Sequence, residues 1–292
     1  MCDHASLDDM VDYELRAERL NRRRFGALTL VASAVTLWSR GASAAEVEGR
    51  EIAIKTADGV ADAYFVHPRS SKHPAVLIWP DIFGLRPAFR QMADRLAADG
   101  YAVLVVNPFY RIKKSPVAAE GADFQDPEVR TALFALRNSL TPVTAETDAK
   151  AFVNWLDDQK SVDRKRRIGT AGYCLGGTLV MQTAAAQPER IGAGASFHGG
   201  GLATDKPDSP HLLIPKMKAQ LLIAIAENDD QREPQAKNVL REAFAAANVP
   251  AEIEVYAGAQ HGWCPPDSRV YNEAQAEKAW GRMLALFQRA LA

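Results

Sequence analysis

The sequence has little of what marks several protein classes. Only three of its 292 residues are cysteine, and no C-x-x-C pair occurs, which argues against a thiol-redox protein. No apolar run is long enough to span a bilayer as a helix. The net charge is −1, and no long basic block lies in the globular part, so a nucleic-acid surface is not expected. Metal-ligand clusters and phosphate-binding loops are also missing from the sequence.

The composition is that of a globular protein whose N-terminus resembles an export signal. Apolar residues make up 47% and charged residues 24% of the chain. The motif Asn21-Arg22-Arg23-Arg24-Phe25 resembles the twin-arginine consensus and precedes an apolar stretch that ends at Trp38. An A-x-A site follows at residues 42–44. We therefore predict a signal peptide over residues 1–44, export by the twin-arginine machinery, and a mature domain over residues 45–292 in the periplasm or outside the cell.

The alternative for this segment is a frayed amphipathic helix with a chance arginine cluster. The order of charge, apolar core and cleavage site favours the signal peptide. Neither alternative provides a stable membrane anchor, because the apolar stretch is too short to span.

Beyond residue 50, apolar strand-like runs alternate with helical patterns. Predicted strands cover residues 51–56, 61–67, 74–79, 101–106, 167–171, 191–197, 220–226 and 252–256. Predicted helices cover residues 87–99, 144–159, 178–186, 234–247 and 272–291. The first two strands flank Asp58-Gly59 and form a hairpin. The later alternation predicts an α/β fold, with a mostly parallel sheet and helices on both faces.

The most informative motif is Gly172-Tyr173-Cys174-Leu175-Gly176-Gly177, which lies between a predicted strand and a predicted helix. It matches the G-x-S-x-G nucleophile elbow with sulfur in place of oxygen. The turn is sharp, so its flanking positions must be small, and glycine supplies that. A thiol in this position indicates acyl transfer through a thioester.

A disulfide between Cys174 and Cys264 is the structural alternative, since signal removal leaves just these two cysteines. A glycine-flanked elbow serves no purpose for a disulfide, so the nucleophile is favoured. Reversible oxidation of the pair remains a hypothesis, because Cys264 follows the predicted base by three residues.

A catalytic thiol needs a base, and the chain order nucleophile, acid, histidine selects one. His261 follows the last predicted strand and is the predicted base. The acid should follow the preceding strand, where Asp229 is favoured over Asp230 and Glu227. His198 also ends a strand, and we favour structural support over substrate contact for it.

Two backbone N–H groups should form an oxyanion hole. Leu175 supplies one, directly after the nucleophile, and Ile82 in the loop after the strand 74–79 supplies the other. Trp263, near the base, either walls the acyl pocket or caps the core beside it.

These motifs together resemble the dienelactone hydrolase (carboxymethylenebutenolidase) family. The matching pieces run in family order over residues 50–292, namely Asp81-Ile82-Phe83-Gly84, Asn107-Pro108-Phe109-Tyr110-Arg111, the Cys174 elbow, His198-Gly199, the Asp229 turn and His261-Gly262. The resemblance implies an α/β-hydrolase fold, a Cys174–His261–Asp229 triad, enol-lactone opening, and neither metal nor organic cofactor. It also suggests a monomer.

Two departures concern substrate binding and control of the thiol. Well-studied members of the family carry a glutamate where this chain has Asp81, and it restrains the thiol until substrate arrives. They also hold the substrate carboxylate with two arginines; Arg111, beside Tyr110, stands in for one, while Pro265 occupies the place of the second. The expected substrate is therefore an ester or enol lactone. A broad carboxylesterase or thioesterase, and a non-catalytic exported binding protein, are the alternatives.

Overall fold

The computed structural model describes residues 46–292, so the predicted signal peptide and its cleavage site lie outside the described residues. The strands are β1 (Val47–Thr56), β2 (Gly59–Pro68), β3 (Ala75–Trp79), β4 (Ala102–Val106), β5 (Ile168–Tyr173), β6 (Ile191–Phe197), β7 (Gln220–Ala226) and β8 (Ala251–Tyr256). The helices are α2 (Pro87–Ala98), α3 (Pro127–Arg137), α4 (Pro142–Asp157), α5 (Leu175–Ala186), the 3₁₀ helix η1 (Pro210–Lys216), α6 (Glu227–Arg232), α7 (Ala236–Ala246) and α8 (Glu273–Ala290).

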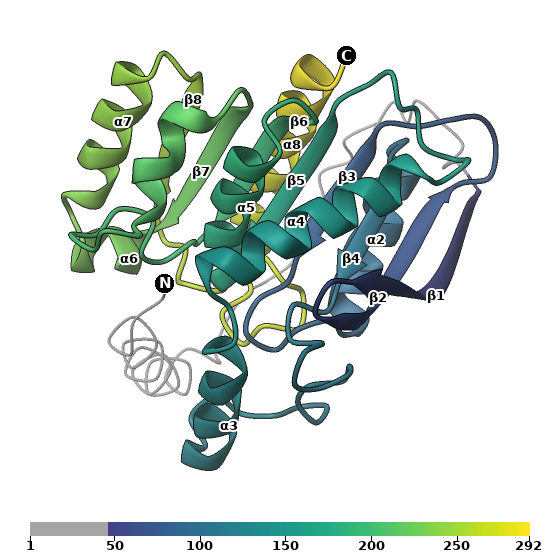
Figure 1. The fold of residues 1–292 in the computed structure, drawn as a ribbon. Helices are drawn as coiled ribbons and strands as arrows, with labels where there is room; N and C mark the ends of the chain where they lie inside the picture. Colours follow the sequence, from purple (N-terminus) through teal and green to yellow (C-terminus); the bar gives the residue numbers. More distant parts are fainter. Residues whose placement is uncertain (1–45) are drawn as a thin grey trace, which may run out of the picture.

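The eight strands of residues 46–292 form one sheet in the order β1-β2-β4-β3-β5-β6-β7-β8. The pairs β1–β2 and β2–β4 are antiparallel, and the pairs from β4 through β3 to β8 are parallel. The central strands β3 to β6 are buried along their whole length, because helices cover both faces of the sheet (Figure 1). The predicted fold class is confirmed.

The core lies in two layers, one on each face of the sheet. Helices α4, α5 and α7 bury their apolar residues against one face, where Phe152, Leu179 and Phe244 are members of the same cluster. Helices α2 and α8 cover the other face with side chains that include Phe89 and Phe287. The two helix layers leave the ends of the strands open for loops.

The parallel strands end at a common edge, and this register positions the candidate site. Trp79 pairs with Gly172, Tyr173 with Phe197, and Ala226 with Tyr256. The residues that follow β3, β5, β6, β7 and β8 therefore emerge side by side. Ligands bind at this carboxyl edge in open α/β sheets.

Three helical segments were not predicted from the sequence. Helix α3 begins at Pro127 after the N-cap Asp126, whose side chain accepts a hydrogen bond from the Glu128 N–H, and it projects beyond the sheet edge (Figure 1). The 3₁₀ helix η1 lies between β6 and β7. The acidic run after β7, interpreted as a turn, is the short helix α6, because its acidic residues favour a helix N-terminus.

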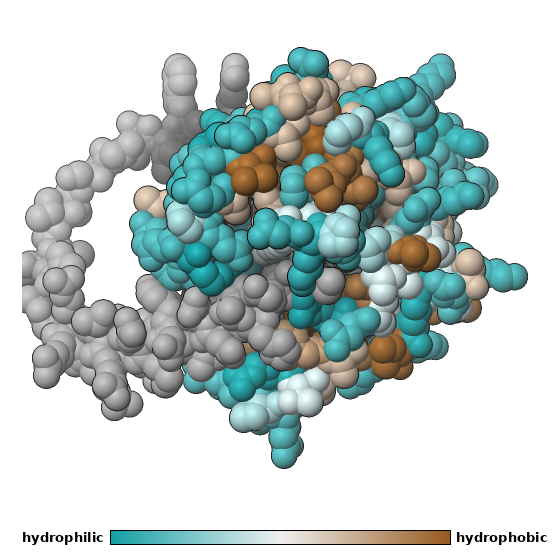
Figure 2. All heavy atoms as spheres, turned by 60° about the vertical axis from the view of Figure 1, so that its left-hand side comes forward, coloured by the Kyte–Doolittle hydropathy of each residue, from teal (hydrophilic) through white to brown (hydrophobic). Residues whose placement is uncertain are grey.

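The surface is largely hydrophilic on the face that Figure 2 shows, and apolar residues form separate small groups there. Single exposed apolar side chains are ordinary for a globular protein. Within residues 46–292, no helix combines the length and the apolarity needed to cross a membrane.

Candidate active site

Cys174 lies between the end of β5 and the start of α5, with backbone angles φ 54° and ψ −119°. Few non-glycine residues adopt such a conformation, and it is typical of functional sites where surrounding structure holds the strain. Its side chain is buried, and its position as N-cap directs it to the positive end of the helix dipole. The predicted elbow geometry is present.

The glycines of the elbow are required by close backbone approaches. A Cβ atom on Gly172 would lie 2.1 Å from the Gly176 carbonyl oxygen, and one on Gly176 would lie 2.3 Å from the carbonyl oxygen of Trp79. The start of α5 is therefore pressed against the end of β3. This contact brings Leu175 beside the loop that carries Ile82.

His261 and Asp229 meet across the loops after β8 and β7. The His261 Nδ1 lies 2.7 Å from Asp229 Oδ2, and Arg232 donates a hydrogen bond of 2.9 Å to Asp229 Oδ1. Burial alone would raise the pKa of Asp229, but the imidazole and Arg232 outweigh it and hold the pKa below its ordinary value. Asp229 is thus a carboxylate poised to orient an imidazole.

The other two candidate acids have different partners. Asp230 forms an ion pair with Lys237 at 2.6 Å, and Glu227 accepts a hydrogen bond from the Gly258 N–H at 3.3 Å. Of the three, Asp229 is the one that the structure brings to His261.

His198 connects the nucleophile loop to the histidine loop. Its Nδ1 accepts a hydrogen bond of 3.0 Å from the Cys174 N–H, and its ring lies 5.1 Å from the ring of His261, centroid to centroid. Because Nδ1 accepts, the proton of the neutral ring is on Nε2. Burial, and next the neighbouring His261, lower the pKa of His198 well below its usual range.

Trp263 belongs to the core beneath these histidines. Its ring is fully buried, stacks on Tyr256 and meets His198 edge-on at 5.1 Å. Of its two predicted roles, the contacts support the cap on the core.

Cys264 and Cys174 are not joined by a disulfide; both are buried thiols. Cys174 belongs to the core cluster on one face of the sheet, and Cys264 to the cluster on the other. Burial raises the pKa of Cys264 well above its usual range, which makes this thiol a poor nucleophile. The disulfide alternative therefore finds no support.

Asp81 is engaged by an arginine that was not singled out in the sequence. Arg86 donates hydrogen bonds of 2.6 and 2.9 Å to the two carboxylate oxygens of Asp81, and it pairs with Asp267 at 2.7 Å. Asp81 Oδ1 also accepts from the Phe83 N–H at 3.0 Å. These bonds tie the loop with Ile82 to the loop after His261. The expected contact of Asp81 with the thiol or with substrate has no support among them.

Arg111 and Tyr110, expected to bind a substrate carboxylate, bond to side chains of the protein instead. Arg111 contacts Asp58 at 2.6 Å and Asp148 at 2.8 Å, and the Tyr110 hydroxyl donates to Asp148 at 2.7 Å. Asp148 is fully buried, so it needs these donors. The network links the β1–β2 turn to α4 and gives both residues a structural role.

No group of three or more His, Cys, Asp or Glu side chains within residues 46–292 is arranged to hold a metal ion. The side chains gathered at the sheet edge have the chemistry of nucleophile, base and orienting acid.

The fold and the arrangement of side chains at the carboxyl edge of the sheet define an α/β hydrolase. Residues 61–291 match the model of the dienelactone hydrolase family, and the chain belongs to that family. Its enzyme class is accordingly that of the carboxylic ester hydrolases.

Individual relatives share low sequence identity with this chain but align with most of its length. The chain is 27% identical over 219 residues to carboxymethylenebutenolidase from Rhodococcus opacus, covering 74% of this chain and 81% of the relative. It is 27% identical over 233 residues to carboxymethylenebutenolidase 2 from Cupriavidus pinatubonensis, covering 79% and 86%. A solved structure assigned as a dienelactone hydrolase from Klebsiella pneumoniae has a TM-score of 0.73 at 24% identity, over 84% of this chain and 99% of that one.

Proposed function

We propose that the protein hydrolyses esters or enol lactones through a thioester on Cys174. The observation that carries the proposal is the run of contacts at the carboxyl edge, from Cys174 through His198 to His261 and Asp229. A strained nucleophile elbow, an imidazole and a buried carboxylate in this order are the parts that acyl transfer needs.

The proposed reaction begins at the thiol. His261 Nε2 takes the proton of Cys174, and the Sγ attacks the carbonyl carbon. The N–H groups of Leu175 and Ile82 stabilise the oxyanion. The imidazolium, stabilised by Asp229, then protonates the leaving alkoxide or enolate, which leaves a thioester on the sulfur. Water, deprotonated by His261, attacks the thioester. The carboxylic acid leaves, and the thiol of Cys174 is regenerated.

The test uses 4-nitrophenyl acetate and a dienelactone with the mature chain. We expect Cys174→Ala to abolish turnover of both, because no other group at the edge replaces the thiol. Cys174→Ser should retain a small rate, since a hydroxyl is a weaker nucleophile in a site built for sulfur. Cys264→Ser is the matched control, because it changes a buried thiol on the other face of the sheet and should keep the wild-type rate.

Activity that survives in Cys174→Ala would overturn the assignment of the nucleophile. A wild-type protein inactive on both esters under reducing conditions would favour a non-catalytic binding protein. Covalent labelling of Cys174 by a substrate, seen as a mass increase equal to the acyl group, would identify the thioester directly.

A broader ester specificity is the second candidate function, and the Arg111 network favours it. The guanidinium that would clamp a lactone carboxylate is bonded to Asp58 and Asp148, and Pro265 offers no charge at the other expected position. The ratio of the two rates in the same assay separates the candidates: a preference for 4-nitrophenyl acetate supports the broad esterase.

A further inference from the structure

A second cavity lies on the face of the sheet that α2 and α8 cover. Met92 of α2 lines one side of it, and Ala276 and Trp280 of α8 line another. It encloses about 570 Å³, part of it open to solvent, and this volume is within the range of small-molecule pockets. The cavity is therefore large enough to hold a bicyclic organic molecule.

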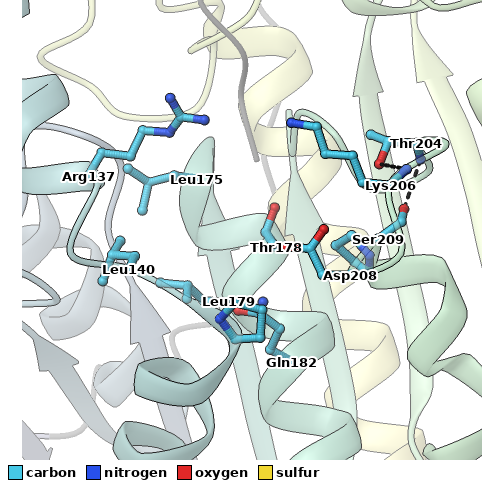
Figure 3. A pocket seen from close by; sticks show the side chains of 12 residues that line it. Arg137, Leu140, Leu175, Thr178, Leu179, Gln182, Thr204, Lys206, Asp208 and Ser209 are labelled. Atoms are coloured by element: carbon cyan, nitrogen blue, oxygen red, sulfur yellow. Dashed lines mark hydrogen bonds between the residues drawn. The ribbon is translucent and has the colours of Figure 1, made fainter.

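This cavity is separate from the one beside the proposed nucleophile. That other cavity lies along the first turns of α5, where Leu175, Thr178 and Leu179 line it (Figure 3). Among residues 46–292, the two cavities have no lining residue in common. They also adjoin different core clusters, since Leu175 and Tyr173 belong to clusters on opposite faces of the sheet. A molecule in the second cavity would thus not enter the cavity of Figure 3.

The inner wall of the second cavity adjoins the proposed catalytic groups. Tyr173 and Phe197 line it, and they directly precede Cys174 and His198 in the chain. Together with Trp280, their rings make much of the lining aromatic. Aromatic walls favour flat, apolar occupants, which they contact by offset stacking or edge to face.

The hydroxyl of Tyr173 is a buried polar group that faces this cavity. The ring of Tyr173 packs against Phe89 and Phe197, at 5.3 and 5.0 Å between centroids, which leaves its hydroxyl end toward the cavity. After burial, the groups that shift the pKa of this hydroxyl most are Cys264 and Arg95, and both line the same cavity. The hydroxyl is thus a polar group to which a bound molecule has access.

This hydroxyl has no hydrogen-bond partner within residues 46–292. The side chain of Tyr173 is only 2% exposed, and a buried hydroxyl without a partner costs free energy. Burial raises the pKa of Tyr173 well above its ordinary value, so the phenol stays protonated and keeps a proton to donate. A bound molecule with an accepting oxygen would complete the missing hydrogen bond.

The charged side chains of the lining neutralise each other at its mouth. Arg95 donates two hydrogen bonds of 2.6 Å to the carboxylate of Glu277, and about half of each side chain is exposed. The guanidinium of Arg95 also lies over the ring of Trp280, 4.3 Å from its centroid. The other residues that line the cavity within residues 46–292 carry no charge. An uncharged occupant is therefore favoured, because an ion would be buried here without a counter-ion.

We propose that this cavity binds an uncharged, flat and largely apolar molecule, with an oxygen that accepts a hydrogen bond from the Tyr173 hydroxyl. The aromatic wall supplies the contact area, and the hydroxyl fixes the orientation. The bound molecule packs directly behind the loops of Cys174 and His198, apart from the ester. This inference does not rest on the proposed hydrolase function.

The test uses two probes, 1-indanone and indane, which share a rigid bicyclic shape and differ by one carbonyl oxygen. Titrations followed by ligand-observed NMR give a Kd for each probe. We expect the wild type to bind 1-indanone. In Tyr173→Phe, the Kd of 1-indanone should rise by about fivefold, the effect of one neutral hydrogen bond, and that of indane should not rise. An unchanged Kd of 1-indanone in Tyr173→Phe would overturn the hydroxyl contact.

Filling the cavity should abolish the binding of both probes. Ala276 lines the cavity from α8, and Ala276→Leu places a larger side chain there with little cost to the helix. Ala274→Leu is the matched control, because it makes the same substitution at an exposed position of the same helix outside the lining. It should keep the wild-type Kd for both probes. Wild-type affinity in Ala276→Leu, or no binding of 1-indanone by the wild type, would overturn the site.

Two further measurements separate this site from the proposed active site. Cys174→Ala should bind 1-indanone as tightly as the wild type, whether or not any ester is hydrolysed. In the wild type, 1-indanone should leave the KM for 4-nitrophenyl acetate unchanged, and a raised KM would place the probe in the ester site instead. If Tyr173→Phe fails to fold, the loss of binding in Ala276→Leu still decides the location.

Discussion

At the scale of single residues, His198 is the most consequential side chain that is not a member of the proposed triad. It holds the Cys174 N–H and supports the His261 ring, and its own backbone has φ 41°. A strained, fully buried histidine between a nucleophile and a base acts as a positioning residue. Its neutral form is the one that the fold selects, since a protonated ring could not accept from the Cys174 N–H.

This selection has a consequence for stability against pH. The unfolded chain protonates His198 near pH 6.5, whereas the folded chain keeps it neutral to much lower pH. Its contribution to stability is therefore complete above about pH 6.5 and is lost as the pH falls. In His198→Asn, the fall in unfolding free energy between pH 6.5 and 5 should be shallower than in the wild type by up to about 1.4 kcal/mol per pH unit.

Urea denaturation at several pH values, followed by tryptophan fluorescence and by circular dichroism, measures this difference. Asparagine is suitable because its amide oxygen can lie near the place of Nδ1 and accept from the Cys174 N–H, and because asparagine tolerates the positive φ at this position. Parallel stability curves for the two proteins would contradict the neutral, buried histidine.

At the scale of elements, Arg86 ties the loop after β3 and the start of α2 to the distant loop after β8. It precedes helix α2, binds Asp81 after β3 and reaches Asp267 in the loop after β8. Because Ile82 follows Asp81, the bridge fixes the loop that should supply one oxyanion donor. The side chain of Arg86 also lies over the ring of Phe89, 4.8 Å from its centroid, which limits its freedom.

Removing Arg86 should reduce both activity and stability. Arg86→Ala leaves the nearly buried Asp81 without its partner, which costs up to about 3 kcal/mol in unfolding free energy. The loosened loop should lower kcat for 4-nitrophenyl acetate by about 100-fold, as for a misplaced catalytic group. Arg90→Ala is the control on the same helix, since it breaks an ion pair with the exposed Glu51 and should cost at most about 1 kcal/mol.

Steady-state kinetics and thermal unfolding of the two variants make the comparison. A variant Arg86→Ala that is less stable but turns over at the wild-type rate would show that the bridge serves folding alone.

Helices and strands could be predicted where a pattern within their own residues indicates them. Strands β6 and β7 have the bounds expected from their continuous apolar runs. Helix α3 was missed because its amphipathic pattern is short, although the Asp126-Pro127 pair is an N-terminal signal that could have found it. The motif around Cys174 and the loop of His261 were recognisable because their residues are neighbours in sequence.

The remainder of the site depends on contacts that no local pattern records. Asp229 and Asp230 are adjacent, and only the direction of each side chain on α6 separates the partner of His261 from the partner of Lys237. Arg111 was expected near substrate, but carboxylates from the β1–β2 turn and from α4 surround it.

At the scale of the whole molecule, the predicted cleavage site precedes the first described strand. Strand β1 begins at Val47, so cleavage after Ala44 would leave all eight described strands in the mature chain. We propose export by the twin-arginine route, for which the motif at Arg22 and Arg23 remains a prediction.

Cell fractionation and N-terminal sequencing test the export. The expected result is a mature protein that begins at Ala45 in the periplasm or the medium. A double variant, Arg22→Lys with Arg23→Lys, should retain the longer precursor in the cytoplasm. A full-length protein found in the cytoplasm of the wild type would contradict the prediction.

The order of the proposed triad along the chain determines when each of its residues is made during synthesis. The thiol follows the central strand β5, while the proposed base follows β8, the last strand in the chain and an edge strand of the sheet. During synthesis the proposed nucleophile is therefore made before the proposed base. On the proposed mechanism, a chain that stops before β8 has the cysteine without the histidine loop and should not turn over esters. On this proposal, catalytic competence appears only after β8 and the loop that follows it have joined the sheet.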